Sequence, residues 1–195
     1  MRTAILLPLF ALVGLPLLGG CGADPAAEQA PDFEGTTLRG EPFRLSDHRG
    51  EVVILNFWAT WCAPCVAEIP AFVRLQDELE GAGVRFVGVS QDADGEAAVR
   101  PFAERFRINY PLLLDSDFAI SRRYGGISYL PTTFVIDREG RVVRQQVGGL
   151  SRAYLLALLD DLDLVDVAAL RDAAPAAIRG TPGRAEPLPA RRPVE

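Results

Sequence analysis

The sequence predicts an α/β protein in which a mixed β-sheet is flanked by helices. Apolar runs with the length of buried strands alternate with segments of helical periodicity over most of the 195 residues, which is typical of strands joined by helices. Near the end of this pattern, two strand-like segments flank Arg138-Glu139-Gly140, which indicates an antiparallel hairpin and makes the sheet mixed. A chain of this length accommodates one domain with extensions rather than two.

The first half of the domain is predicted to contain a small hairpin, two buried strands and a long helix. Residues 31–45 suggest a β-hairpin that leads into the domain. Residues 52–57 are apolar apart from Asn56, as in a central strand covered on both faces, and residues 84–89 form a second buried strand. Between these strands, residues 63–80 place apolar side chains at helical spacing.

The second half contains shorter elements. They are predicted as a helix at 96–106, a strand at 112–114, a helix at 117–124, and the strands of the terminal hairpin at 133–137 and 142–147. Pro101 is expected to kink or split the first of these helices. Ser151 is then expected to cap a final, leucine-rich helix.

Residues 1–20 are predicted to be a signal peptide. Arg2 is followed by an uncharged, mostly apolar run at 5–18, which is shorter than the roughly 20 residues that span a bilayer. The run ends at Leu18-Gly19-Gly20-Cys21, which resembles the lipobox of bacterial lipoproteins, in which the cysteine is lipidated and becomes the new N-terminus. The alternative is a plain secretory signal followed by an incidental cysteine.

The remaining boundaries follow from composition. Residues 21–31 are small, polar and proline-bearing, and are predicted to be a flexible tether. Residues 171–195 are rich in Pro, Ala and Arg, cannot bury a core, and are predicted to be disordered. This leaves residues 32–170 as the folded domain.

Composition and charge exclude several classes of protein. With 49% apolar and 24% charged residues, the chain is neither a polytopic membrane protein nor fibrous nor wholly disordered. All 20 basic residues are arginines, and with 26 acidic residues they leave a net charge of −6, which argues against nucleic acid as a partner. Three cysteines are too few for a small fold held together by disulfides.

Cys62 and Cys65 carry the strongest chemical signal, because the segment WCAPC follows a buried strand and begins a helix. A structural disulfide here would close too short a loop to stabilise the fold much. A zinc site would need two further ligands, and the only histidine is His48. A Cu(I) site would favour thioether ligands, and the only methionine is Met1, which leaves with the signal peptide.

A redox dithiol is the fourth interpretation and fits the position best. The N-terminus of a helix carries unpaired N–H groups and a partial positive charge, which stabilise a thiolate at Cys62 and make it the attacking nucleophile. Cys65, one turn further on, is placed to resolve the mixed disulfide. With Cys21 lipidated, no odd cysteine is left over.

Further stretches surround this motif: the lead-in PDFEGTTLRGEPFRLSDHRG, the strand and motif VVILNFWATWCAPC, then Glu68 and Pro70, GVSQD, and YLPTTFVIDREGRVV. Together, over residues 31–162, they resemble the thioredoxin superfamily and, within it, the extracytoplasmic TlpA/ResA-like thiol–disulfide oxidoreductases. The resemblance implies a thioredoxin-like mixed sheet flanked by helices, with an N-terminal β-hairpin lead-in and an inserted βα unit, placed here at residues 91–114.

The resemblance also implies a docking site beside the dithiol. Pro131 matches the family's cis-proline, which holds the extended chain of a substrate next to the sulfurs; the alternative is an ordinary trans proline in a turn. Trp61 and Thr132, which neighbour Cys62 and Pro131 in the sequence, are expected to lie where a substrate docks.

Glu68 is the expected proton partner of the dithiol. It lies one helical turn after Cys65, and the subgroup likeness implies that it exchanges a proton with that cysteine. The alternative is a solvated acid on the helix face. Asn56, which cannot exchange a proton, stands where thioredoxin keeps a buried aspartate beneath its dithiol. Trp58 is expected in the core.

The predicted function is therefore that of a thiol–disulfide oxidoreductase tethered to a membrane outside the cytoplasm, on the periplasmic face. The resemblance implies that it reduces disulfides of exported proteins, with apocytochrome c as a common target, and that a membrane electron donor of the thiol-reductant type reduces it again. No metal or organic cofactor is needed. Two alternatives are a Cu(I)-binding chaperone and a peroxiredoxin-like peroxidase. The Pro-x-x-x-Thr-x-x-Cys pattern of such peroxidases is absent, because Leu55 and Ala59 stand at the positions of its Pro and Thr.

Overall fold

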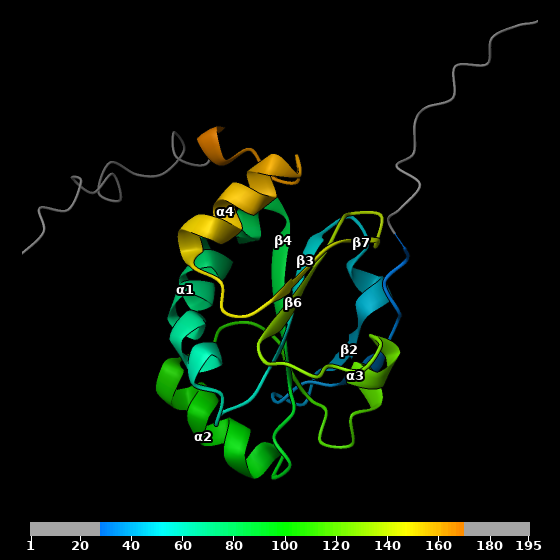
Figure 1. Cartoon of the computed structure of the whole chain (residues 1–195), viewed down its shortest axis with the longest axis vertical. Helices are drawn as coiled ribbons and strands as arrows, with labels where there is room; N and C mark the ends of the chain where they lie inside the picture. The colour runs from blue at the N-terminus through cyan, green and yellow to red at the C-terminus, as the bar shows by residue number, and fades with distance from the viewer. Residues whose placement is uncertain (1–27, 170–195) are drawn as a thin grey trace, which may run out of the picture.

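Residues 28–169 are described in the structure, a computed structural model of the chain (Figure 1). A five-stranded sheet has the order β5-β4-β3-β6-β7, and β1 and β2 form a separate two-stranded sheet. The strands are β1 (Glu34–Thr36), β2 (Pro42–Arg44), β3 (Val52–Trp58), β4 (Val84–Ser90), β5 (Leu112–Leu114), β6 (Thr132–Ile136) and β7 (Val142–Val147).

The large sheet is mixed, as predicted. β3 lies in its centre, parallel to β4 and antiparallel to β6; β5 extends the sheet in parallel beside β4, and β7 in antiparallel beside β6. Every residue of β3 is buried, which explains why its sequence is almost continuously apolar. The predicted lead-in hairpin forms the antiparallel pair β1–β2, and Leu38 just after β1 donates to the carbonyl of Leu112, covering the edge strand β5.

The helices cover both faces of the sheet. The α-helices are α1 (Ala63–Leu79), α2 (Glu96–Phe106), α3 (Ala119–Arg123) and α4 (Arg152–Asp161), and the short 3₁₀ helices are η1 (Leu45–His48) and η2 (Glu80–Ala82). In Figure 1, α1, α2 and α4 lie on one side of the sheet, and α3 and the β1–β2 hairpin lie on the other. The predicted helices are thus present; α2 continues through Pro101, and Ser151 caps α4 by accepting from the N–H of Tyr154.

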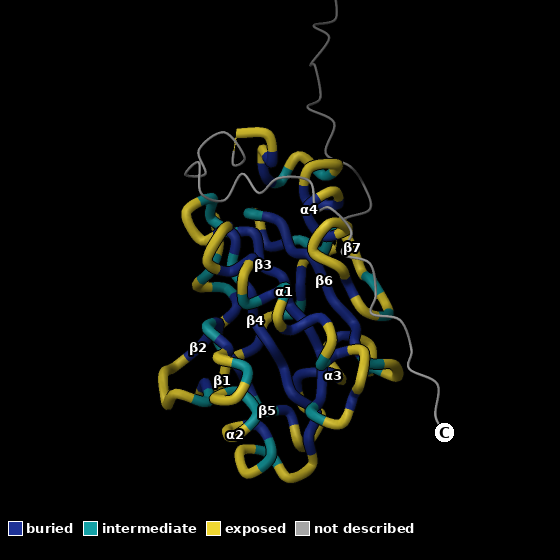
Figure 2. Tube along the Cα trace, turned by 90° about the vertical axis from the view of Figure 1, so that its left-hand side faces the viewer, coloured by how far each residue is buried: buried dark blue, intermediate teal, exposed yellow. Residues whose placement is uncertain are grey.

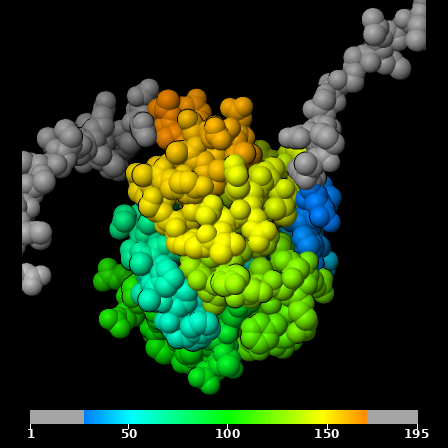
Figure 3. Space-filling view, in the orientation of Figure 1, coloured from blue at the N-terminus to red at the C-terminus, as the bar shows by residue number. Residues whose placement is uncertain are grey.

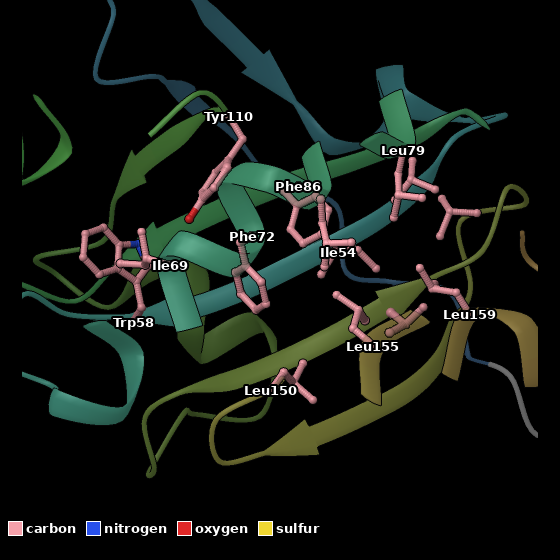
Figure 4. Packing of buried hydrophobic residues seen from close by; sticks show 14 of the residues in the cluster. Ile54, Trp58, Ile69, Phe72, Leu79, Phe86, Tyr110, Leu150, Leu155 and Leu159 are labelled. Atoms are coloured by element: carbon pink, nitrogen blue, oxygen red, sulfur yellow. The ribbon is translucent and has the colours of Figure 1, made fainter. Parts of the chain in front are cut away.

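The core lies on the two faces of the sheet (Figure 2). On the face of α1 and α4, Ile54 of the central strand packs with side chains that include Phe72 and Leu155 (Figure 4). Side chains alternate along a strand, so Val53 and Leu55 belong to the cluster on the opposite face. Trp58, predicted in the core, is buried at the end of β3. Because β3 and β4 are parallel, the residues that follow these two strands lie at the same end of the sheet.

The N-terminal end of the described chain is attached at the opposite end of that sheet. The amide of Val142 donates to the carbonyl of Glu28, the amide of Ala30 donates to Gly140, and Gln29 forms a β-bridge with Arg141. Residues 28–30, predicted as part of the end of the tether, thus pair with the β6–β7 turn, because their backbone groups find partners there. The ordered domain begins before the predicted boundary at residue 32.

Several predictions concern residues outside the described range. These are the signal peptide 1–20, lipidation of Cys21, the first part of the tether and the tail 171–195. Within residues 28–169, no helix combines the length and the apolar character that crossing a membrane requires.

Candidate active site

Cys62 and Cys65 form a disulfide at the first turn of α1. Cys62 is the N-cap of the helix, and its sulfur accepts a hydrogen bond from the amide of Cys65 at 3.3 Å. Cys62 is 5% exposed and Cys65 is fully buried, so the outer sulfur belongs to Cys62. The roles of Cys62 as nucleophile and Cys65 as resolving cysteine stay predictions that this placement allows.

A cis peptide bond joins Leu130 to Pro131, as the resemblance implies. Thr132, predicted where a substrate docks, is buried, and its hydroxyl donates to the carbonyl of Tyr129 at 2.7 Å, so its side chain is engaged within the loop. The side chains that reach solvent are instead those of Trp61, 70% exposed, and Tyr129, 72% exposed. Tyr129 carried no signal in the sequence other than its position two residues before Pro131.

The loop between β7 and α4 completes the site. The amide of Gly148 donates to the carbonyl of Pro131 at 2.8 Å, and a Cβ added to Gly149 would lie 3.7 Å from the carbonyl oxygen of Pro64. In the space-filling view, the cyan-to-teal surface of the start of α1 adjoins the yellow-green and yellow surface of the segments before β6 and after β7 (Figure 3). Three loops distant in sequence therefore meet around the disulfide.

Glu68 is buried beneath this site, with 3% of its surface exposed. Its Oε1 accepts from Nδ2 of Asn56 at 2.9 Å, and its Oε2 accepts from the amide of Leu150 at 2.8 Å. Burial disfavours the charged form and raises the pKa of Glu68 to about 7, although both hydrogen bonds oppose the shift. Glu68 is thus a buried carboxyl that changes its protonation near neutral pH, and the alternative of a solvated acid is wrong.

Two partners in this network were not predicted. Thr133, in register with Asn56 on the neighbouring strand, accepts from Asn56 Nδ2 at 3.0 Å. Asn56 and Thr133 are polar residues within two mostly apolar strands, and this is the sequence signal that could have revealed the pair. Leu150 contributes only its backbone amide, which no side-chain pattern reports.

Other candidate ligands lie elsewhere. His48 lies within hydrogen-bond distance of Glu51, 2.9 Å between Nδ1 and Oε2, before the start of β3 and so at the far end of the sheet from the disulfide. Across residues 28–169, His, Cys, Asp and Glu side chains form no group of three that could hold a metal ion. The disulfide is the redox group that the structure contains.

A disulfide at the first turn of the helix that follows the central strand of a mixed sheet defines a thioredoxin-fold thiol–disulfide oxidoreductase. The chain belongs to the AhpC/TSA family, whose model matches residues 26–145. It is 38% identical to the thiol-disulfide oxidoreductase ResA of Geobacillus kaustophilus over 156 residues, covering 78% of this chain and 88% of that protein.

Solved structures agree with this assignment. A thiol:disulfide interchange protein of the thioredoxin family from Chlorobium tepidum superposes with a TM-score of 0.65 at 34% identity, covering 71% of this chain and 98% of that one. The exposed lipoprotein thioredoxin of Streptococcus pneumoniae superposes with a TM-score of 0.60 at 30% identity, covering 67% of this chain and 98% of that one. The predicted fold and the predicted oxidoreductase activity are confirmed.

Proposed function

We propose that this oxidoreductase works as a reductant outside the cytoplasm, where it reduces disulfides of exported proteins. The direction of the reaction and the compartment rest on the family resemblance. The observation that carries the mechanism is the buried Glu68, whose pKa of about 7 lets it exchange a proton one helical turn from Cys65. In the reduced protein, the Cys62 thiolate attacks a partner disulfide and releases one partner thiolate, which takes up a proton. A mixed disulfide forms.

Glu68 then assists the second step. Cys65 must lose its proton to attack the sulfur of Cys62, and an ionised Glu68 can accept that proton. The attack breaks the mixed disulfide, releases the second partner thiol and leaves the Cys62–Cys65 disulfide that the structure contains. Two electrons have passed to the partner, and a membrane electron donor of the thiol-reductant type restores the dithiol.

Membrane tethering and the substrate class complete the proposal. The lipobox-like segment before Cys21 supports lipid attachment, and one similar solved structure is described as an exposed lipoprotein. Among exported proteins, apocytochrome c is the substrate class that the family resemblance favours, because its cysteines must be reduced before haem attachment.

The reduction potential tests the direction of the reaction. Equilibration of the purified domain with glutathione should give a potential well below the roughly −120 mV of the oxidant DsbA. A value at or above that figure would make the protein an oxidant and overturn the proposal. Insulin-disulfide reduction, peroxide consumption and Cu(I) retention, measured on the same sample, separate it from the peroxidase and chaperone alternatives.

Lipidation of Cys21 makes a second prediction. The full-length protein should partition with membranes, because two or more acyl chains anchor a protein stably where one is marginal. Cys21→Ser should appear in the soluble fraction or keep its signal peptide. An unmodified Cys21 at the N-terminus of the mature protein, measured by intact mass, would contradict the tethering while leaving the redox chemistry untouched.

A further inference from the structure

The turn that leads into the dithiol is fastened to the neighbouring strand by a buried carboxylate. Residues Ala59–Cys62 form a turn closed by a hydrogen bond from the amide of Cys62 to the carbonyl of Ala59 at 3.1 Å. Asp92, 2% exposed, accepts from the amide of Thr60 at 3.0 Å and from the hydroxyl of Thr60 at 2.5 Å. The first inner residue of the turn is thus held by one side chain.

Asp92 is itself held from several directions. Its Oδ2 accepts from the hydroxyl of Ser90 at 2.7 Å, and the amide of Asp92 donates to the hydroxyl oxygen of Ser90 at 3.1 Å. Its carbonyl accepts from the hydroxyl of Ser116 at 2.9 Å, and the amide of Gln91 donates to the carbonyl of Trp58 at 2.9 Å. The end of β4 and the start of the inserted βα unit therefore hold the Ala59–Cys62 turn in place through hydrogen bonds.

The same carboxylate brings a negative charge close to the nucleophile. Thr60 lies two residues before Cys62, and two residues span at most about 7 Å. The carboxylate is 3.0 Å from the Thr60 amide, so it lies within about 10 Å of the Cys62 backbone. Because Asp92 is buried, solvent screens its charge poorly.

We propose that Asp92 is a positioning residue that also tunes the dithiol: it fixes the Ala59–Cys62 turn and disfavours the Cys62 thiolate electrostatically, which makes the pair a stronger reductant. The reduced protein carries a thiolate and the disulfide does not, so a nearby negative charge favours the disulfide. This inference concerns the redox properties of Cys62 and Cys65 and does not depend on the substrate. It is tested by the change in reduction potential between the wild type and its variants, whereas the proposed direction of the reaction is tested by the potential of the wild type itself.

Asp92→Asn removes the charge and keeps the shape. The pH dependence of Cys62 alkylation by iodoacetamide should shift to lower pH by about one unit. The equilibrium constant with glutathione should change by up to about tenfold in favour of the dithiol, which raises the reduction potential by up to about 30 mV. The matched control is Asp137→Asn. Asp137 is a buried carboxylate, bound to Arg141 at the far end of the sheet, and its replacement should leave both measurements unchanged. Wild-type values for Asp92→Asn would make Asp92 a purely structural residue.

Thr60→Val gives a test of opposite sign. Valine has the shape of threonine but removes the hydroxyl donor, so the charge of Asp92 is less compensated and the potential should fall rather than rise. A role limited to holding the turn would move both variants in the same direction. A shift of Thr60→Val toward the dithiol, or no shift at all, would overturn the proposal even if Asp92→Asn fails to fold.

Discussion

Replacing Cys65 with serine is expected to turn the protein into a trap for its partners. Cys62 occupies the outer position at the first turn of α1, where N–H groups and the helix dipole favour its thiolate. The first displacement can therefore still occur. Without the Cys65 sulfur the mixed disulfide cannot be resolved, so adducts should accumulate through Cys62 and insulin reduction should fall to background.

Cys62→Ser is the matched control. The remaining thiol at Cys65 is fully buried, so it should form far fewer adducts although overall activity is lost equally. Adducts are counted on non-reducing gels, and mass spectrometry of the trapped partners identifies the natural substrates. Equal trapping by both variants would mean that Cys62 is not the nucleophile.

Replacing Glu68 with glutamine is expected to remove a pH dependence from both stability and turnover. Burial raises the pKa of Glu68 from 4.5 to about 7. The contribution of the protonated Glu68 to the free energy of unfolding is therefore fully present below pH 4.5 and is lost as the pH rises through 7. Between pH 5 and pH 8 the oxidised wild type should lose roughly 2–3 kcal/mol of unfolding free energy relative to Glu68→Gln. Turnover above pH 7 should fall on the order of 10²-fold in the variant.

The slope with pH is the informative measurement, because glutamine also loses a hydrogen bond. Both partners of Glu68, Asn56 and the Leu150 amide, are donors, and the amide group of glutamine offers them one oxygen instead of two. Urea unfolding at several pH values separates this constant loss from the titration. Hydrogen bonding to Arg85 lowers the pKa of Glu51 to about 2, so its contribution changes below pH 4.5 and does not overlap.

Exposed Glu104 provides the control for the charge change. Glu104→Gln alters the same functional group on the surface of α2 and should follow the wild-type curve at every pH. If Glu68→Gln follows that curve too, and its alkylation profile matches the wild type, Glu68 does not exchange a proton with the dithiol.

The fold was predictable from the sequence because its strongest patterns report burial. β3 and β4 are covered on both faces and read as apolar runs, and α1 shows its buried face at helical spacing. The start of the domain was placed too late. Residues 28–30 have the composition of a linker, but their contacts with the β6–β7 turn are made by backbone groups, which amino-acid composition does not report.

The site was predictable where its chemistry depends on side-chain type and spacing. The cysteines are recognisable in that way, whereas Glu68 and Pro131 were predicted from the family resemblance. The Leu150 amide was not, because any residue could supply it, and Asp92 passed unnoticed within the GVSQD stretch because its partner Thr60 is 32 residues away in the chain. Hydrogen bonds between a turn and a residue far away in the chain leave no local pattern in the sequence. The polar residues at the end of the buried strand β4 are the signal that could have indicated them.

If Cys21 carries a lipid, as proposed, the attachment of Glu28 beside the β6–β7 turn puts the tethered end of the domain at the end of the sheet away from the dithiol. β3 separates that turn from the dithiol by about 20 Å over its seven residues. Cys21 precedes Glu28 by seven residues, which span at most about 25 Å. In an anchored domain whose β6–β7 turn faces the bilayer, Cys62 points into the aqueous space, toward passing proteins and away from the bilayer. A donor embedded in that bilayer would then reach the disulfide in one of two ways: its own thiols extend away from the bilayer, or the domain tilts toward the bilayer. In the second case, the domain would be reduced in one orientation and would reduce its substrates in another.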